Sequence, residues 1–158
     1  MIIFNFSVLA RPAESLPLRQ PDPEGRDIWS WVFTAHYGRI ALVVNEDYEK
    51  PLLEEWLKRE GFKPSMYEFI LESQPVLRAE RVHRLAAVFG KARWYIDNHP
   101  EVCAETLKLG IPTLMVASPY IVRPEWVHER QIRPWDTLVE EVNRQSLERS
   151  SRAWRDEL

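Results

Sequence analysis

Short, almost continuous apolar runs that alternate with segments of helical spacing restrict the fold of this 158-residue chain more than any other feature. The clearest runs lie at 2–9, 40–44, 94–96 and 113–117, and a weaker one lies at 67–71. Runs of this kind are typical of buried parallel strands. Their alternation with helices predicts a three-layer, Rossmann-like α/β domain, in which helices cover both faces of a mostly parallel sheet.

Helix signals fill the intervals between these runs. The many prolines of 11–26 predict a loop, after which Asp27 is expected to cap a helix that ends near Gly38. Three further helices are expected at 51–61, 82–90 and 100–110, each closed by a glycine. The chain from Trp135 onward also has a helical pattern. We expect an α/β domain at 1–133 and a C-terminal helix at 134–158, partly packed on the domain and frayed at its end.

Composition excludes several classes of protein. The formal net charge of −3 provides no basic field, so a nucleic-acid partner is not expected. Cys103 is the only cysteine, which rules out an internal disulfide and predicts a core position for its side chain. No apolar run approaches the roughly 20 residues that span a membrane, and the chain opens on a strand-like run instead of a charged leader. A cytoplasmic protein without membrane contact is expected.

Polar residues stand where the predicted strands end. In parallel sheets the ligand site lies beyond the carboxyl ends of the strands. Four such ends, listed here in chain order, should therefore lie close together: Asn5–Ser7, Asn45, Asp97–Asn98 and Ala117–Ser118.

The ordered set of strand ends resembles the haloacid dehalogenase (HAD) superfamily of phosphohydrolases over roughly residues 1 to 120. That family has an Asp-x-Asp pattern after the first strand, where Asn5 and Ser7 stand here. Asn45 occupies the place of its Ser or Thr motif, and Asp97-Asn98 matches its acidic motif. For its Lys or Arg motif, Lys91 is the first candidate and Arg78 the alternative. The intervals between elements leave no room for a cap domain, and small capless chains of this type are frequent in bacteriophages.

The departures from that pattern predict that the chemistry is lost. The resemblance implies a nucleophilic Asp, an acid–base Asp and carboxylates that bind Mg²⁺. The Asn5 amide is no nucleophile, and Ser7 cannot replace a carboxylic acid. Asp97 is the clear surviving carboxylate and the only plausible remnant metal ligand, with Glu101 one helical turn away. We therefore expect no cofactor, at most weak Mg²⁺ binding and no catalytic residue, and we interpret the loss as natural divergence.

Each of these residues also has a simpler explanation. Asp97 could cap the helix near Pro100, and Asn5 and Ser7 could satisfy backbone groups at a strand end. Lys91 could be a solvated surface residue, and the four histidines show no metal-ligand spacing. Four tryptophans are expected in or near the core: Trp29, Trp31, Trp56 and Trp94. Three others lie in the less regular C-terminal third, where they could anchor a partner: Trp126, Trp135 and Trp154.

Three functions remain open. The first is a catalytically inactive HAD-like module, a pseudophosphatase, that binds a protein partner or self-associates through the aromatic-rich C-terminal third. The second is a weakly active Mg²⁺-dependent phosphatase or nucleotide-binding protein. Under either function, a retained ligand would contact the following residues: Asn5, Ser7, Asn45, Lys91, Asp97 and Asn98. The third is a nucleic-acid-binding accessory protein whose basic face would comprise Arg144, Arg149, Arg152 and Arg155, although nearby Glu148, Asp156 and Glu157 offset it.

Overall fold

The computed structural model of this chain describes residues 1–11, 15–90, 92–117, 139–140 and 142–148. The chain divides into two compact units, Met1–Val116 and Ala117–Leu158. The second unit is helical at 139–140 and 142–148. The predicted boundary between 133 and 134 falls outside the described residues and stays a prediction. None of the helices in the described part combines the length and apolar content that a bilayer crossing requires.

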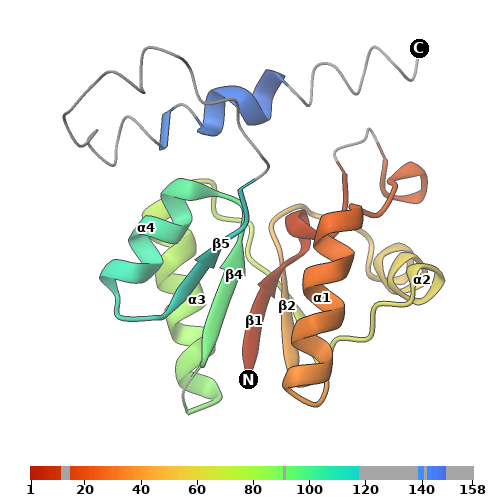
Figure 1. Cartoon of the computed structure of the whole chain (residues 1–158), viewed down its shortest axis with the longest axis horizontal. Helices are drawn as coiled ribbons and strands as arrows, with labels where there is room; N and C mark the ends of the chain where they lie inside the picture. Colours follow the sequence, from red (N-terminus) through yellow and green to blue (C-terminus); the bar gives the residue numbers. More distant parts are fainter. Residues whose placement is uncertain (12–14, 91, 118–138, 141, 149–158) are drawn as a thin grey trace. The chain divides into compact units, whose positions relative to one another are not determined.

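The first unit is built on five parallel strands, which confirms the predicted Rossmann-like α/β class (Figure 1). The strands are β1 (Ile2–Asn5), β2 (Ile40–Val44), β3 (Met66–Phe69), β4 (Trp94–Asp97) and β5 (Thr113–Met115). Their order across the sheet is β3-β2-β1-β4-β5, with β1 in the centre. Phe4 pairs with Leu42 on one side and with Ile96 on the other. The carboxyl ends of β1, β2 and β4 therefore meet at one edge of the sheet.

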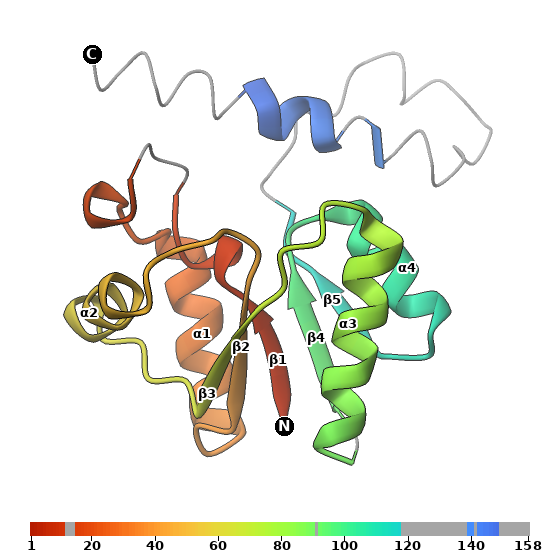
Figure 2. The ribbon, with the colours of Figure 1, turned by 180° about the vertical axis from the view of Figure 1, so that it is seen from behind.

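Four helices connect the strands: α1 (Pro23–Ala35), α2 (Lys50–Glu60), α3 (Pro75–Val88) and α4 (Pro100–Lys108). Each has a proline in its first turn, where the missing N–H would have no helical partner. Gly61 ends α2 with a φ of 79°, in the left-handed region that favours glycine. In both views of the ribbon the strands run between α1 and α2 on one side and α3 and α4 on the other (Figures 1 and 2).

Alternate residues of β1, β2 and β4 point into two separate cores, because strand side chains alternate between the faces of a sheet. One core receives Phe4 and Leu42 and packs against α1 and α2. We call its ring-bearing part the aromatic cluster: Phe4, Phe6, Trp29, Trp56 and Phe62. The other core receives Ile3, Val43 and Tyr95 and packs against α3 and α4.

The segment after β1 differs from its prediction. The strand ends at Asn5, and Phe6–Val8 form a 3₁₀ turn, η1, although their apolar side chains are buried as in a strand. A second 3₁₀ turn, η2, covers Leu16–Leu18. The helix α1 then begins at Pro23, and the side chain of Asp22, not Asp27, caps it by accepting the N–H of Gly25 at 3.0 Å. The prolines of this loop concealed the helix start, since one of them is its first residue.

Gly25 lies in the first turn of α1 against η1. A Cβ at this position would stand 1.8 Å from the carbonyl oxygen of Val8. Any side chain here would displace either the helix or the turn, so the absence of a side chain sets how closely they approach.

Three further expectations about burial are wrong. β5 is shorter than predicted and only partly buried, because it is an edge strand paired with β4 alone. Trp31 and Trp94 are 63% and 41% exposed, whereas Trp29 and Trp56 are in the core as expected. An amphipathic pattern locates the buried face of an element, but a large aromatic residue at its margin fits either side. Cys103 is buried, as predicted.

Candidate functional site

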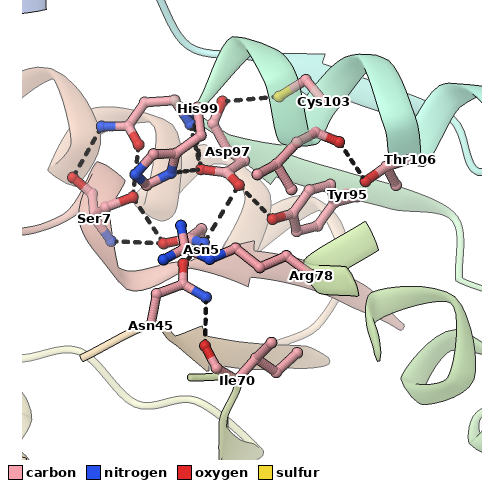
Figure 3. Close-up of polar contacts among 12 residues, drawn as sticks. Asn5, Ser7, Asn45, Ile70, Arg78, Tyr95, Asp97, His99, Cys103 and Thr106 are labelled. Carbon is pink, nitrogen blue, oxygen red and sulfur yellow. Dashed lines mark hydrogen bonds and ion pairs between the residues drawn. The ribbon is translucent and has the colours of Figure 1, made fainter. Parts of the chain in front are cut away.

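The polar side chains at the carboxyl ends of β1, β2 and β4 form one hydrogen-bonded group, as the sequence predicts (Figure 3). We call it the carboxyl-edge cluster: Asn5, Ser7, Asn45, Asp97 and Asn98. Asn5 and Asp97 are 1% and 0% exposed, while Ser7, Asn45 and Asn98 are half-buried. The cluster therefore has a buried centre and an accessible rim.

Asn5 is the hub of the cluster. Its Nδ2 donates to Asn45 Oδ1 at 2.6 Å and to Asp97 Oδ2 at 3.3 Å. Its Oδ1 accepts the backbone N–H of Ser7 at 2.9 Å and lies 2.7 Å from Ser7 Oγ. A backbone N–H can only donate and an ionised carboxylate can only accept, so these partners fix the orientation of the amide. Both N–H groups of the Asn5 amide therefore have acceptors, and its Oδ1 accepts at least the backbone N–H of Ser7.

Ser7 has one hydroxyl proton but two nearby acceptors. Its Oγ lies 2.7 Å from Asn5 Oδ1 and 2.6 Å from Asn98 Oδ1. The hydroxyl can donate to only one of them at a time. The Nδ2 of Asn98 donates to the carbonyl of Ser7 at 3.2 Å, which ties the end of β4 to η1.

Asp97 is a buried carboxylate surrounded by donors. Its Oδ2 accepts from the Tyr95 hydroxyl and from Asn5. Its Oδ1 accepts the backbone N–H groups of Asn98 at 2.6 Å and His99 at 3.1 Å, and lies 2.8 Å from His99 Nδ1. A buried charge is tolerated when it is hydrogen-bonded in this way. The two amides belong to the turn before α4, so Asp97 does not cap the helix itself, whose N-cap residue is His99.

The surroundings of Asp97 perturb two other groups. Burial, followed by the charge of Asp97, raises the pKa of Tyr95 well above its ordinary value. The same two causes raise the pKa of the Cys103 thiol. Both groups are held in their neutral forms, and the thiol is accordingly no nucleophile.

Asn45 links the cluster to β3, because its Nδ2 donates to the carbonyl of Ile70 at 2.9 Å. Of the two basic candidates, Lys91 lies outside the described residues, and its described neighbours precede β4, at the opposite edge of the sheet. Arg78 lies in the first turns of α3, and Figure 3 shows its side chain directed toward Asn5 and Asn45. Its Nε donates to the carbonyl of Glu72 at 2.5 Å. Within the described ranges, no carboxylate forms an ion pair with Arg78.

A second polar group holds the loops beside the cluster. Arg19, which is 8% exposed, donates to both carboxylate oxygens of Glu46 at 2.9 Å and lies over the ring of Tyr48. Its carbonyl accepts the indole N–H of Trp56 at 3.0 Å. These contacts fasten the loop after β1 to the loop after β2, and no sequence pattern predicts them.

The donor set does not fit Mg²⁺. This cation takes oxygen ligands, usually including one or two carboxylates. Here the oxygens of Asp97 already accept internal donors, and an Asn5 N–H group points at Asp97 where a cation would have to lie. Among the residues that the structure describes, no three His, Cys, Asp or Glu side chains are grouped to hold a metal ion.

Several predicted residues lie outside the described ranges, namely Ser118, Trp126, Trp135, Arg149, Arg152, Trp154 and Arg155. Ala117 is described and exposed. Sequence reasoning missed the contacts of Tyr95 and His99 with Asp97. The contact of Tyr95 could have been predicted, since residues two apart on a strand point to the same face of the sheet. The contact of His99 could not, because the geometry of the turn before α4 decides where its ring points.

Fold and site together define a Rossmann-like α/β domain with a self-satisfied polar cluster at the carboxyl edge of its sheet. Comparison with models of protein families gives no match, and neither does comparison with curated proteins.

Proposed function

We propose that this chain is a three-layer, capless HAD-like domain that does not transfer phosphoryl groups and acts by binding a protein partner or a second copy of itself. The observation that carries the proposal is the Asn5 amide. It stands where the resemblance would require a nucleophilic carboxylate, and both of its N–H groups and its oxygen have hydrogen-bond partners within the chain.

The amide of Asn5 gives the buried carboxylate of Asp97 a hydrogen-bond donor that an aspartate at this position could not supply. An aspartate at position 5 would face Asp97 across about the same 3.3 Å that now separates Asn5 Nδ2 from Asp97 Oδ2. Two carboxylates at that separation repel each other unless a cation or a proton lies between them. The N–H of Asn5 takes the place of that cation. An amide at position 5 therefore supplies neither the nucleophile nor a second carboxylate for a metal.

The short connections at this edge support a binding role for an open surface. Only residues 45–49 separate β2 from α2, and only 70–74 separate β3 from α3. The longer loop after β1 is held down by Arg19 and Glu46. No connection among these has the length of a cap domain, and a domain without a cap suits a macromolecular partner better than a small substrate.

Phosphatase assays test the loss of chemistry. We expect p-nitrophenyl phosphate to be hydrolysed by the purified chain at the background rate, both with Mg²⁺ and with EDTA. Mg²⁺-dependent turnover that disappears in Asp97→Ala would contradict the proposal, provided that circular dichroism shows the variant to be folded. Exposed Glu55→Ala is the matched control for loss of a carboxylate.

Sedimentation velocity and affinity capture test the binding role. We expect concentration-dependent self-association, or a stoichiometric protein partner, that Trp135→Ala weakens. The control is Trp31→Ala, which removes an exposed tryptophan from α1. A chain that stays monomeric at all concentrations and captures no stoichiometric partner would contradict this part of the proposal.

A second candidate, binding of a phosphate-bearing ligand without turnover, is favoured by Arg78. Arginine recognises phosphate through its fork of N–H donors. Arg78 reaches the carboxyl edge and has no ion-pair partner within the described part of the chain. Calorimetric titration with ADP and with inorganic phosphate tests this candidate. Binding lost in Arg78→Gln but kept in Arg84→Gln, an exposed residue of the same helix, would support it.

The nucleic-acid alternative gains no support. Arg144, the one residue of the predicted basic face that is described, forms an ion pair with Glu148.

A further inference from the structure

The contact between Asp97 and His99 orients an accessible imidazole. Asp97 is fully buried, whereas the side chain of His99 is 41% exposed. An ionised carboxylate only accepts hydrogen bonds, so the 2.8 Å contact places the ring proton of a neutral His99 on Nδ1. The lone pair is then on Nε2, at the far side of the ring from Asp97. In the described part of the chain no group bonds to Nε2.

The position of Asp97 is itself fixed from several directions. Tyr95 and Asn5 bind its other oxygen, and the backbone N–H groups of Asn98 and His99 bind the oxygen that contacts the imidazole. A carboxylate held on both oxygens cannot rotate away from His99. The geometry corresponds to a general base oriented by a third group.

A hydroxyl lies in the same cluster. Ser7 Oγ is 2.6 Å from Asn98 Oδ1, and Asn98 immediately precedes His99 in the chain. Figure 3 shows the His99 ring on the side of Asp97 that faces Ser7. In this conformation the hydroxyl donates to one of two amide oxygens, so the reaction requires its side chain to turn from them toward the imidazole. Such rotations of half-exposed side chains are fast.

We propose that Ser7, His99 and Asp97 form a nucleophilic site that hydrolyses small activated carboxylic esters. This activity is distinct from phosphoryl transfer and does not rest on the binding function proposed above. Ser7 Oγ bonds to the ester carbonyl carbon as its proton passes to His99 Nε2. The bond from that carbon to the leaving oxygen breaks, and His99 returns the proton to the alcohol. Water then attacks the acyl-serine with the same proton transfers, which releases the acid. Asp97 is a positioning residue.

The test combines ester hydrolysis with covalent labelling of the full chain. We expect the chain to hydrolyse p-nitrophenyl acetate faster than free imidazole does at the same concentration. His99→Ala should lower kcat/KM by about 10²-fold, at the lower end of what a general base contributes. Ser7→Ala should lower it at least as much. Asp97→Asn should lower kcat and leave KM unchanged, which a purely structural role would not produce. Ser65→Ala and His83→Ala are the controls and should keep full activity.

A fluorophosphonate probe identifies the nucleophile without requiring turnover. Its phosphorus bonds to the reacting oxygen as fluoride leaves, and peptide mass mapping locates the adduct. We expect the adduct on Ser7, formed much more slowly in His99→Ala, a variant that removes only an accessible ring and should remain folded. Labelling elsewhere, no labelling, or hydrolysis that survives in Ser7→Ala would overturn the proposal.

Discussion

The aromatic cluster and the carboxyl-edge cluster begin at neighbouring residues of β1, Phe4 and Asn5, and both are buried. They are held together differently. The aromatic cluster relies on buried area and on ring contacts, such as the 5.1 Å between the centroids of Phe6 and Trp56. The carboxyl-edge cluster relies on donors that meet acceptors at fixed positions. Volume should therefore decide the effect of substitutions in the first cluster, and charge and hydrogen-bonding type in the second.

The largest effect is expected from Trp56→Ala. This side chain is 1% exposed, contacts Phe6 and Phe62, and donates its indole N–H to Arg19. Loss of its volume should lower the free energy of unfolding by about 3–5 kcal/mol, as for other buried large aromatics. Urea unfolding measures this change in the free energy of unfolding. Trp31→Ala, on the exposed face of α1, is the control, and an equal loss there would remove the distinction between core and surface tryptophans.

Asn5→Asp should cost nearly as much, although it changes no volume. It creates an uncompensated charge beside buried Asp97, which should lower the free energy of unfolding by about 3 kcal/mol. Millimolar Mg²⁺ should restore part of this loss in the variant and leave the native chain unaffected. Thermal unfolding with Mg²⁺ and with EDTA measures both. Full stability of Asn5→Asp without a cation would mean that charge does not govern this cluster.

Tyr95→Phe tests the residue that belongs to both environments, with a ring in the apolar core and a hydroxyl on Asp97. Loss of a hydrogen bond to a charged group should cost about 1.5–3 kcal/mol near neutral pH. Because burial raises the pKa of Tyr95, the folded chain keeps the phenol proton at pH values where the unfolded chain releases it. The native free energy of unfolding should therefore fall above about pH 10, by about 1.4 kcal/mol per pH unit for this group.

Urea unfolding of the native chain and of Tyr95→Phe, repeated from pH 8 to about pH 11 around the ordinary tyrosine pKa, isolates that contribution. Cys103 and Tyr48 also have raised pKa values and are present in both proteins, so the difference between the two curves belongs to Tyr95. Exposed Tyr37→Phe is the control. Parallel curves for the native chain and Tyr95→Phe would show that folding does not raise the pKa of the Tyr95 phenol.

The smallest effect is expected from Phe62→Leu in the aromatic cluster. Phe62 packs against Trp29 and Trp56. Leucine is also apolar and similar in size, so this substitution should lower the free energy of unfolding by about 1.5 kcal/mol or less. Urea unfolding compares it directly with Asn5→Asp. If Phe62→Leu were the more damaging of the two, the contrast between volume and charge would be wrong.

The sequence allowed the sheet and the location of the cluster to be predicted for one physical reason. Parallel strands end at a common edge, so the polar residues after β1, β2 and β4 must meet, whatever their chemistry. Bond directions could not be predicted in this way. The orientation of the Asn5 amide and of the His99 ring depends on partners that are distant in sequence, and on the turn that leads into α4.

The basic residue expected at the site shows the same limit of prediction from sequence. Lys91, the first candidate, lies outside the described residues and stays a prediction. Arg78, the alternative, lies further from β4 in sequence, yet its side chain reaches the carboxyl edge because α3 begins there. Sequence distance from β4 gave no indication of that position. The HAD resemblance, the phage origin and the cytoplasmic location remain predictions.

The contact between Gly25 and Val8 has a consequence for mutational tolerance. The first turn of a helix ordinarily accepts most residue types, yet the Val8 carbonyl oxygen occupies the space of the first side-chain carbon at position 25. A library selected for folded protein should therefore retain only glycine at this position while its neighbours Glu24 and Arg26 vary. Because Val8 follows Ser7 directly, we expect a larger residue 25 to weaken the contact between Ser7 and Asn98 as well. A position with no functional group of its own would then influence the geometry of the rim.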